Sequence, residues 1–179
     1  SSSAASDVYK RQVKCGVIGI GYMGELHTRV LSEIKNAGLA GISDIEQRKG
    51  ERTAKKYSCK FFADYNELLK ETNCVFIATP TNTHRDISIK ALNSGNHVFV
   101  EKPISSDIDE AEEIIKTARN ENLLLQVGHI ERFNPAILAA KKFIKNPLFI
   151  EAHRLSPFYG RGTDVSVVLD LMIHDLDII

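Results

Sequence analysis

The sequence has 179 residues, carries 23 Lys and Arg against 23 Asp and Glu, and is 43% hydrophobic, which is typical of a globular protein with a buried core. Basic and acidic residues are interspersed, so we expect neither nucleic acid nor an anionic membrane as a partner. No apolar run approaches the roughly 18 residues needed to span a bilayer.

Residues 1–12 stand apart from the pattern that follows. They are rich in serine and lack the basic start and apolar centre of a secretory signal, so we expect an appended or disordered extension. Cys15, Cys59 and Cys74 stand singly, without Cys-x-x-Cys spacing. This usage favours reduced thiols in a cytoplasmic protein and no metal site.

From residue 13 onward, short apolar runs alternate with longer amphipathic ones, which predicts an α/β fold: a doubly wound parallel sheet of the Rossmann type. The predicted strands are Val13 to Ile20, Leu39 to Ser43, Lys60 to Phe62, Cys74 to Ala78, Val98 to Val100 and Leu123 to Val127. Asp64 with Glu67, and Asp107 with Glu110, resemble the capping pairs that begin helices, here at Tyr65 and Ile108.

A glycine-rich turn follows the first strand, with the sequence Gly19-Ile20-Gly21-Tyr22-Met23-Gly24. Gly19 permits a tight turn, Gly21 lets the backbone approach a pyrophosphate, and Gly24 lets the next helix pack against the strand. The N-terminus of that helix would face the phosphates. The motif therefore predicts a dinucleotide site, with a plain tight turn as the alternative.

Asp44 ends the second apolar run at the spacing expected of an acid that binds the adenosine ribose. Its charge would repel a 2′-phosphate, so NAD is favoured over NADP as the cofactor. Arg48 lies near enough in sequence to weaken that preference. Asp44 can also serve as the N-cap of a helix over residues 45–56, and both roles can hold together.

Two further strands are followed by residues suited to a ligand site, because parallel sheets bind ligands beyond their carboxyl ends. After the fourth strand comes Thr79-Pro80-Thr81-Asn82-Thr83-His84, which predicts either cofactor contacts or a turn capped by Thr83. After the fifth comes Glu101-Lys102-Pro103. Proline holds Lys102 extended, and a lysine there can stabilise an alkoxide or exchange a proton with it, although such a tripeptide is commonly a surface turn.

The character of the chain changes after Val127. We expect a polar connection over 128–135, a helix from Ala136 to Lys145, a strand from Leu148 to Leu155, a loop over 156–163, and a helix from Val167 that is still running at Ile179. The domain boundaries follow: 13–127 is the NAD(P)-binding domain, and 128–179 is the incomplete start of a second, substrate domain. The chain is thus interpreted as a fragment.

Asp170 and His174 are four residues apart in the last helix. They share one helical face, so the carboxylate can orient the imidazole and raise its basicity. This spacing indicates an acid/base pair. A single structural or solvated histidine is the alternative.

These features in this order resemble the glucose-fructose oxidoreductase / inositol dehydrogenase (Gfo/Idh/MocA) family. The matching positions are residues 19–24, Asp44, residues 78–84, residues 95–103, and Asp170 with His174. The resemblance implies a Rossmann domain followed by an open-sheet α/β domain, and NAD(P)-dependent hydride transfer at a sugar carbinol. It implies that Lys102, Asp170 and His174 surround the reacting hydroxyl. We also expect Glu101 and Lys102 to contact the cofactor.

Within that family, residues 128–135 and 164–175 look most like the branch acting on UDP-N-acetylglucosamine at carbon 3. The substrate-binding candidates are Lys102, Arg132, Asn134, Arg154, Arg161 and His174. Arginines suit a diphosphate because a guanidinium pairs two oxygens at once. We expect the second domain to complete the pocket and to supply the contact of a homo-oligomer. The alternatives are a myo-inositol or other free-sugar dehydrogenase, and a non-catalytic sugar sensor that keeps the dinucleotide fold.

Overall fold

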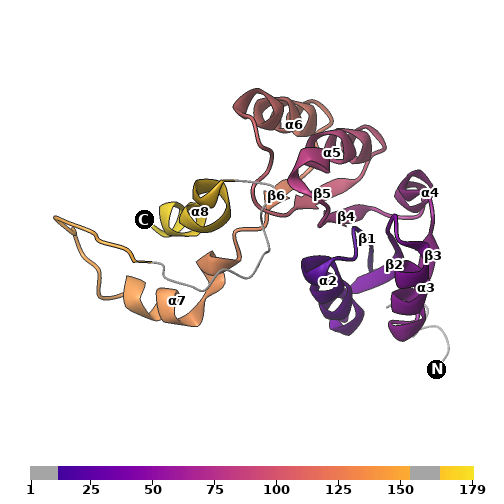
Figure 1. Cartoon of the computed structure of the whole chain (residues 1–179), viewed down its shortest axis with the longest axis horizontal. Coiled ribbons are helices and arrows are strands. Elements are labelled where there is room, and N and C mark those ends of the chain that lie inside the picture. The colour runs from indigo at the N-terminus through magenta and orange to yellow at the C-terminus, as the bar shows by residue number, and fades with distance from the viewer. Residues whose placement is uncertain (1–11, 154–165) are drawn as a thin grey trace.

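The computed structural model describes residues 12–153 and 166–179, and its centre is a six-stranded, all-parallel sheet in the order β3-β2-β1-β4-β5-β6 (Figure 1). The strands are β1 (Val13–Ile18), β2 (Ala37–Ser43), β3 (Lys60–Phe62), β4 (Cys74–Ile77), β5 (His97–Val100) and β6 (Leu125–Val127). The order reverses at β1 and β4, as in a doubly wound sheet. The predicted fold class is therefore confirmed.

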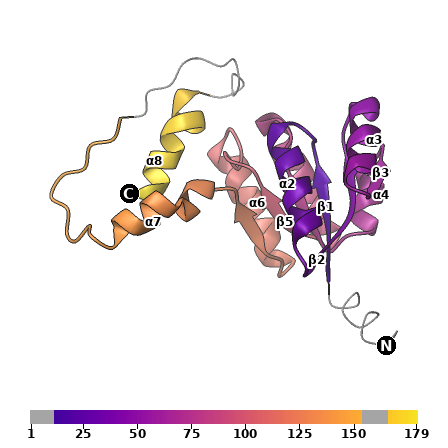
Figure 2. The same cartoon turned by 90° about the horizontal axis from the view of Figure 1, so that it is seen from below.

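Helices cover both faces of this sheet (Figure 2). The helices between the strands are α2 (Tyr22–Glu33), α3 (Gln47–Lys56), α4 (Tyr65–Lys70), α5 (His84–Asn93) and α6 (Ile108–Asn120), with a 3₁₀ turn η1 (Thr81–Thr83). Helices α2 and α3 pack on one face, and α4, α5 and α6 on the other. Both faces are thus shielded from water, as a parallel sheet requires.

Each face has its own apolar core, and β1 contributes to both. Val17 packs with Leu31 and Ile42 beneath α2, whereas Ile18 packs with Leu68 and the residues beneath α4 and α5. Successive side chains of a strand point to opposite faces, so one buried strand supplies both cores. This explains why β1 is apolar almost without interruption.

The ends of the strands differ from the predictions in physically simple ways. β1 stops at Ile18 because Gly19 has φ +85, a left-handed conformation that ends the strand. β4 ends at Ile77, while β2 and β5 begin one or two residues earlier than predicted. β6 begins at Leu125 rather than Leu123, since the Leu123 amide still donates to Ala118 in the preceding helix end.

Two predicted helix starts are confirmed with their caps. Asp64 Oδ1 accepts from the amide of Asn66, and Asp107 Oδ1 accepts from the amide of Asp109 at 2.8 Å. Each bond satisfies a backbone donor that the first helical turn leaves unpaired. Helices α4 and α6 begin directly after these caps.

The segment after β6 turns away from the sheet (Figures 1 and 2). It contains a 3₁₀ turn η2 (Ile130–Phe133), α7 (Pro135–Lys141), and a C-terminal helix made of a π-helical turn η3 (Val168–Met172) and α8 (Ile173–Ile178). The predicted helix over 136–145 is thus shorter, and the predicted C-terminal helix is present.

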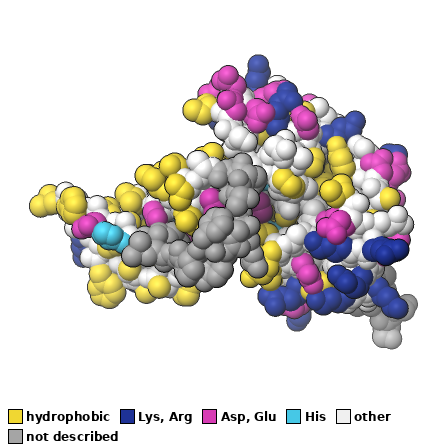
Figure 3. All heavy atoms as spheres, viewed as in Figure 1, with side chains coloured by type: hydrophobic (Ala, Val, Ile, Leu, Met, Phe, Trp, Pro, Cys, Tyr) yellow, Lys and Arg dark blue, Asp and Glu magenta, His cyan; other side chains and the backbone are white. Residues whose placement is uncertain are grey.

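The strand predicted from Leu148 to Leu155 is wrong over residues 148–153, and its last two residues lie outside the described part of the chain. A strand needs a neighbour to satisfy its backbone, and no strand within residues 12–153 or 166–179 pairs with residues 148–153. Leu148 and Phe149 are exposed, as are Phe143 and Ile144, and Figure 3 shows apolar side chains gathered over this segment. The apolar run reflects hydrophobicity without sheet pairing.

Cys15 and Cys74 stand opposite each other on β1 and β4, and all three cysteines carry free thiols. Burial raises the pKa of Cys59 to about 11.

The helices of the described residues include none that is both long enough and apolar enough to cross a membrane.

Candidate functional site

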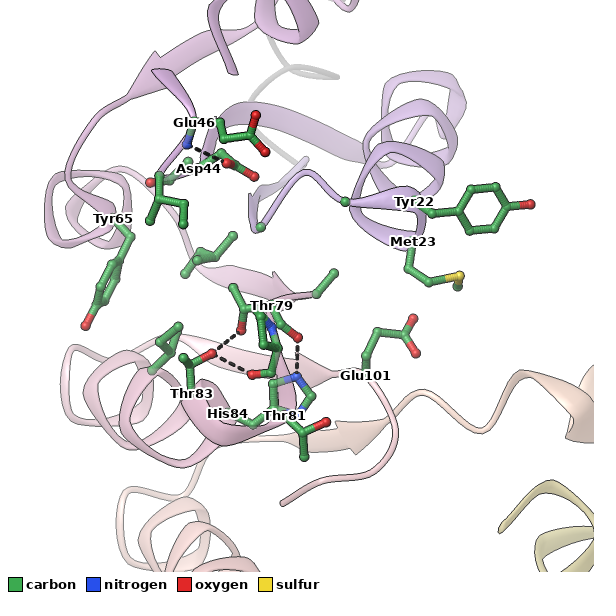
Figure 4. Close-up of a pocket in the computed structure, with 18 of the residues that line it drawn as sticks. Tyr22, Met23, Asp44, Glu46, Tyr65, Thr79, Thr81, Thr83, His84 and Glu101 are labelled. Atoms are coloured by element: carbon green, nitrogen blue, oxygen red, sulfur yellow. Dashed lines mark hydrogen bonds between the residues drawn. The ribbon is translucent and has the colours of Figure 1, made fainter. Parts of the chain in front are cut away.

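A cavity of about 850 Å³ lies over the carboxyl ends of β1, β2, β4 and β5, and we call it the strand-end cavity (Figure 4). Its described lining includes the predicted site residues Gly19, Gly21, Tyr22, Met23, Asp44, Thr79, Pro80, Thr81, Thr83, His84, Glu101, Lys102 and Asp170. Every parallel strand ends at this edge, which is why residues far apart in sequence meet there.

The glycine turn has the geometry that the motif predicts. A Cβ on Gly19 would lie 2.7 Å from the Ala78 carbonyl, and one on Gly24 would collide with the Gly19 carbonyl. Both positions therefore accept only glycine. A Cβ on Gly21 would instead meet nothing within 4 Å, so open space lies over this residue at the N-terminus of α2.

Asp44 accepts hydrogen bonds from two backbone amides, one in the turn after β1 and one in the turn after β2. One oxygen accepts from the amide of Ile20 at 2.5 Å and the other from the amide of Glu46 at 2.7 Å. The Ile20 side chain is fully buried, so it is the backbone amide of Ile20 that contributes to the site, by holding Asp44. The expected cap needs correction: α3 begins at Gln47 with Glu46 at its N-cap, so Asp44 stabilises the turn before the helix.

The basic residue at this end of the cavity is Lys49 rather than Arg48. Lys49 lines the cavity, whereas Arg48 is exposed and is absent from the described lining. In a helix, neighbouring residues point 100° apart, so sequence proximity alone could not decide between them. Figure 3 shows basic side chains gathered on the surface over α2 and α3.

The turn after β4 is tied together by its own polar groups (Figure 4). Thr83 occupies the N-cap position of α5 but does not cap it, because its hydroxyl bonds back toward Thr79 and the Pro80 carbonyl. His84 is buried, and its ring nitrogens lie 2.9 Å from the carbonyls of Thr79 and Pro103. His84 therefore joins the loops that follow β4 and β5.

One residue that the sequence reasoning missed is His27, on α2. Its Nε2 donates to Glu101 Oε1 at 2.6 Å, and both side chains are largely buried. The only signal in the sequence is that His27 lies one helical turn beyond Gly24, on the side of α2 that faces the sheet. Its partner, in the loop after β5, could not be inferred from spacing.

Lys102 and Asp170 both line the strand-end cavity and form an ion pair there. Lys102 Nζ lies 2.7 Å from both the carboxylate and the backbone carbonyl of Asp170, and the two side chains are 18% and 30% exposed. The structure thus brings together two of the predicted catalytic residues. His174 follows one turn later on the same C-terminal helix.

The other substrate-binding candidates lie further along the chain, after β6. Arg132 Nε lies 2.9 Å from Oδ1 and 2.8 Å from Oδ2 of Asp177. Asn134 caps α7, because its Oδ1 accepts from the Ala136 amide. The bond from Arg132 holds the pKa of Asp177 below its usual value. Arg154 and Arg161 lie outside the described residues.

The strand-end cavity fits a dinucleotide. The open space over Gly21 leaves room for a phosphate at a helix N-terminus, and Asp44 stands at the ribose position after β2. Polar side chains from the loops that follow β4 and β5 line the other half. Among the described residues, no group of three His, Cys, Asp or Glu side chains is placed to hold a metal ion.

This combination of sheet, glycine turn and strand-end cavity defines a dinucleotide-binding domain of the Rossmann type. The chain belongs to the Gfo/Idh/MocA oxidoreductase family with an NAD-binding Rossmann fold, whose model matches residues 13–129. The predicted resemblance and the NAD-binding character of the fold are thereby confirmed.

Relatives extend the similarity into the segment after β6. The UDP-N-acetylglucosamine 3-dehydrogenase of Acidithiobacillus ferrooxidans is 38% identical over 93% of this chain and 53% of its own length, and its structure matches with a TM-score of 0.87 over 55% of that chain. The scyllo-inositol dehydrogenase of Lactobacillus casei, solved with NAD(H) and scyllo-inositol, is 28% identical, with a TM-score of 0.70 over 74% of this chain and 40% of that one. The chain spans about half the length of the relatives it matches.

Proposed function

We propose that this chain is the cofactor-binding part of an NAD-dependent dehydrogenase that oxidises a sugar carbinol, the 3-hydroxyl of UDP-N-acetylglucosamine or a similar nucleotide sugar. The observation that carries the proposal is the Lys102–Asp170 pair in the lining of a cavity that fits a dinucleotide. The similarity to the Acidithiobacillus ferrooxidans enzyme over 93% of the chain supports the substrate class.

When bound, NAD would supply the hydride acceptor. Asp44 would accept the hydroxyls of the adenosine ribose, and the Gly21 turn would receive the pyrophosphate. Glu101 lies across the cavity from Asp44 (Figure 4), so it would face the nicotinamide half. Lys102 follows Glu101 after β5 and would face the same half.

The reacting hydroxyl would lie against Lys102. The ammonium group would stabilise the developing alkoxide, and His174 would take the hydroxyl proton. In the structure two oxygens of Asp170 accept hydrogen bonds from Lys102 Nζ, which holds the cation in the cavity lining. Asp170 would thus place the lysine as well as balance its charge.

The wider organisation follows from the same proposal. Residues 13–127 would form the cofactor domain, 128–179 would begin the substrate domain, and residues 1–12 would belong to neither.

The three free thiols are compatible with a cytoplasmic protein. We also propose a homo-oligomer, with its contact supplied by the second domain.

A substrate panel tests the proposal. The intact protein that carries this chain would be mixed with NAD and with UDP-N-acetylglucosamine, free myo-inositol or glucose, while the absorbance of NADH is recorded. We expect the highest kcat/KM with the nucleotide sugar. Replacing Arg132, Arg154 and Arg161 by Met, one at a time, should raise the Michaelis constant for it through at least one of them.

Other outcomes would change the conclusion in distinct ways. Higher kcat/KM with inositol or glucose, and no effect of the three arginine changes, would overturn the substrate class but leave a sugar dehydrogenase. NADH binding without oxidation of any sugar would instead indicate a non-catalytic sensor.

A further inference from the structure

We propose that His27 is a positioning residue for the cofactor: it holds the Glu101 carboxylate at the nicotinamide half of the strand-end cavity and thereby sets the affinity for NAD(H). The inference rests on the proposed NAD site. Glu101 lines the cavity, whereas His27 lies behind it and is not part of the described lining.

The histidine is fixed in place by its surroundings. Its ring packs edge-on against Phe99 with centroids 5.1 Å apart and lies 5.5 Å from Phe76, and these two rings stack on each other at 5.0 Å. Such contacts restrict the imidazole to one orientation. Nε2 is thereby aimed at Glu101 Oε1, 2.6 Å away.

The carboxylate is also confined from the opposite side. A Cβ on Gly128 would lie 2.8 Å from Glu101 Oε2 and 3.1 Å from its carboxyl carbon, so glycine at 128 leaves just enough room for the second oxygen. The Glu101 amide donates to Ile77, which fixes the backbone beneath it. His27 and Gly128 thus bound the carboxylate between α2 and β6.

A carboxylate held in one orientation is suited to binding a nucleotide. Burying a carboxylate costs free energy unless hydrogen bonds satisfy its oxygens. A carboxylate with no fixed partner could also adopt several side-chain orientations. A carboxylate has about four acceptor positions, and the bond from His27 occupies one of them. The remaining positions stay available, in a fixed orientation, for the hydroxyl donors of a bound nucleotide.

The test is a double-mutant cycle on NADH affinity, read from nucleotide fluorescence with the intact protein. We expect His27→Leu to weaken binding about tenfold, as for a lost hydrogen bond to a charged group. Glu101→Gln should cause a similar loss, and adding His27→Leu to Glu101→Gln should weaken binding no further, because both changes remove one effect. His27→Gln keeps an N–H donor and should recover most of the affinity.

Two further variants separate positioning from stability. Leu31→Ala opens a void under the same helix without touching Glu101, so it should lower the melting temperature while leaving NADH affinity unchanged. Gly128→Ala pushes Glu101 from the other side and should weaken NADH binding even if His27→Leu fails to fold.

The proposal is overturned if His27→Leu binds NADH like the parent, or if its effect is equally large in the Glu101→Gln background. A parent protein that bound no NADH would overturn it together with the cofactor site. A parent that bound NADH but oxidised no sugar would refute only the proposed reaction, and the affinities would still decide the role of His27.

Discussion

Three glycines in one short turn serve different purposes, and the structure separates them. Gly19 and Gly24 are required by the fold, since any Cβ there would strike backbone. Gly21 has open space above it and is required by nothing within the described chain. The sequence motif cannot make this distinction, because it shows only that three glycines are present.

This difference predicts opposite effects of two alanine substitutions. Gly21→Ala should leave the melting temperature nearly unchanged but weaken NADH binding, because the methyl group would fill the space left for a phosphate. Gly19→Ala should destabilise the fold by more than the roughly 1–2 kcal/mol that a left-handed alanine costs, since it also meets the Ala78 carbonyl.

Gly95 provides the matched control. It has φ +81 but no atom within 4 Å of its Cβ position, so Gly95→Ala should cost only the conformational term. Urea unfolding and NADH titration of the three variants check the set. A loss of stability in Gly21→Ala as large as in Gly19→Ala would contradict the assignment of the phosphate position.

Asp44 has two duties, and substitutions should resolve them. Asp44→Ala should weaken NADH binding more than NADPH binding, because it removes the ribose acceptor while Lys49 remains nearby for a 2′-phosphate. The same change also removes the bonds to Ile20 and Glu46, so stability should fall. Equal loss of affinity for both nucleotides would show that Asp44 only supports the turn.

Lys102 is predicted to act on the reaction more than on the cofactor. Lys102→Met should lower turnover by roughly 10²–10⁴-fold while NADH affinity stays nearly intact, as expected of a group that acts on the transition state. Steady-state kinetics and nucleotide titration of the intact protein separate these effects. Turnover like that of the parent would reduce Lys102 to a turn residue.

At the scale of elements, the C-terminal helix is tied to the rest of the chain by ion pairs at its two ends. Lys102 binds Asp170 near its start, and Arg132 of η2 binds Asp177 near its end. His129 lies 3.6 Å from the same Asp177 carboxylate. These contacts hold the helix that carries His174 beside the cavity.

The Arg132–Asp177 pair predicts a pH dependence. Because the pKa of Asp177 is lowered in the folded chain, the stabilisation is fully present above the unfolded pKa of about 3.9 and is lost as the pH falls through the folded pKa. Arg132→Met should therefore speed amide hydrogen exchange in α8 at pH 7 but have little effect well below pH 4.

The exposed Lys70–Glu67 pair is the control for this experiment, and Lys70→Met should leave exchange in α8 unchanged at either pH. If Arg132→Met left α8 equally protected at pH 7, the pair would be a surface contact without a role in placing the helix.

The sequence predicts the regular elements well where periodicity and caps agree, as at Asp64 and Asp107. It fails over residues 148–153, because hydrophobicity predicts burial but not which strand will be the neighbour. The site follows the same division. The residues after each strand are predictable from the parallel sheet, whereas His27–Glu101 and Lys102–Asp170 join segments whose approach only the tertiary fold defines.

On the scale of the whole molecule, β1 holds the two halves of the sheet together. It pairs with β2 on one side, where Val13 meets Ala37, and with β4 on the other, where Cys15 meets Cys74. The strand-end cavity takes its lining from both halves. Neither half can form it alone.

The central position of β1 affects the order in which the sheet assembles during folding. Pairing with β4 closes a longer loop than pairing with β2, and non-local parallel pairings form slowly. During refolding, far-UV ellipticity should therefore recover before the ability to bind NADH, because helices and single β-α-β units precede the joined sheet. Stopped-flow refolding in the presence of NADH measures both signals. Recovery of both at one common rate would mean that the two halves fold as a single unit.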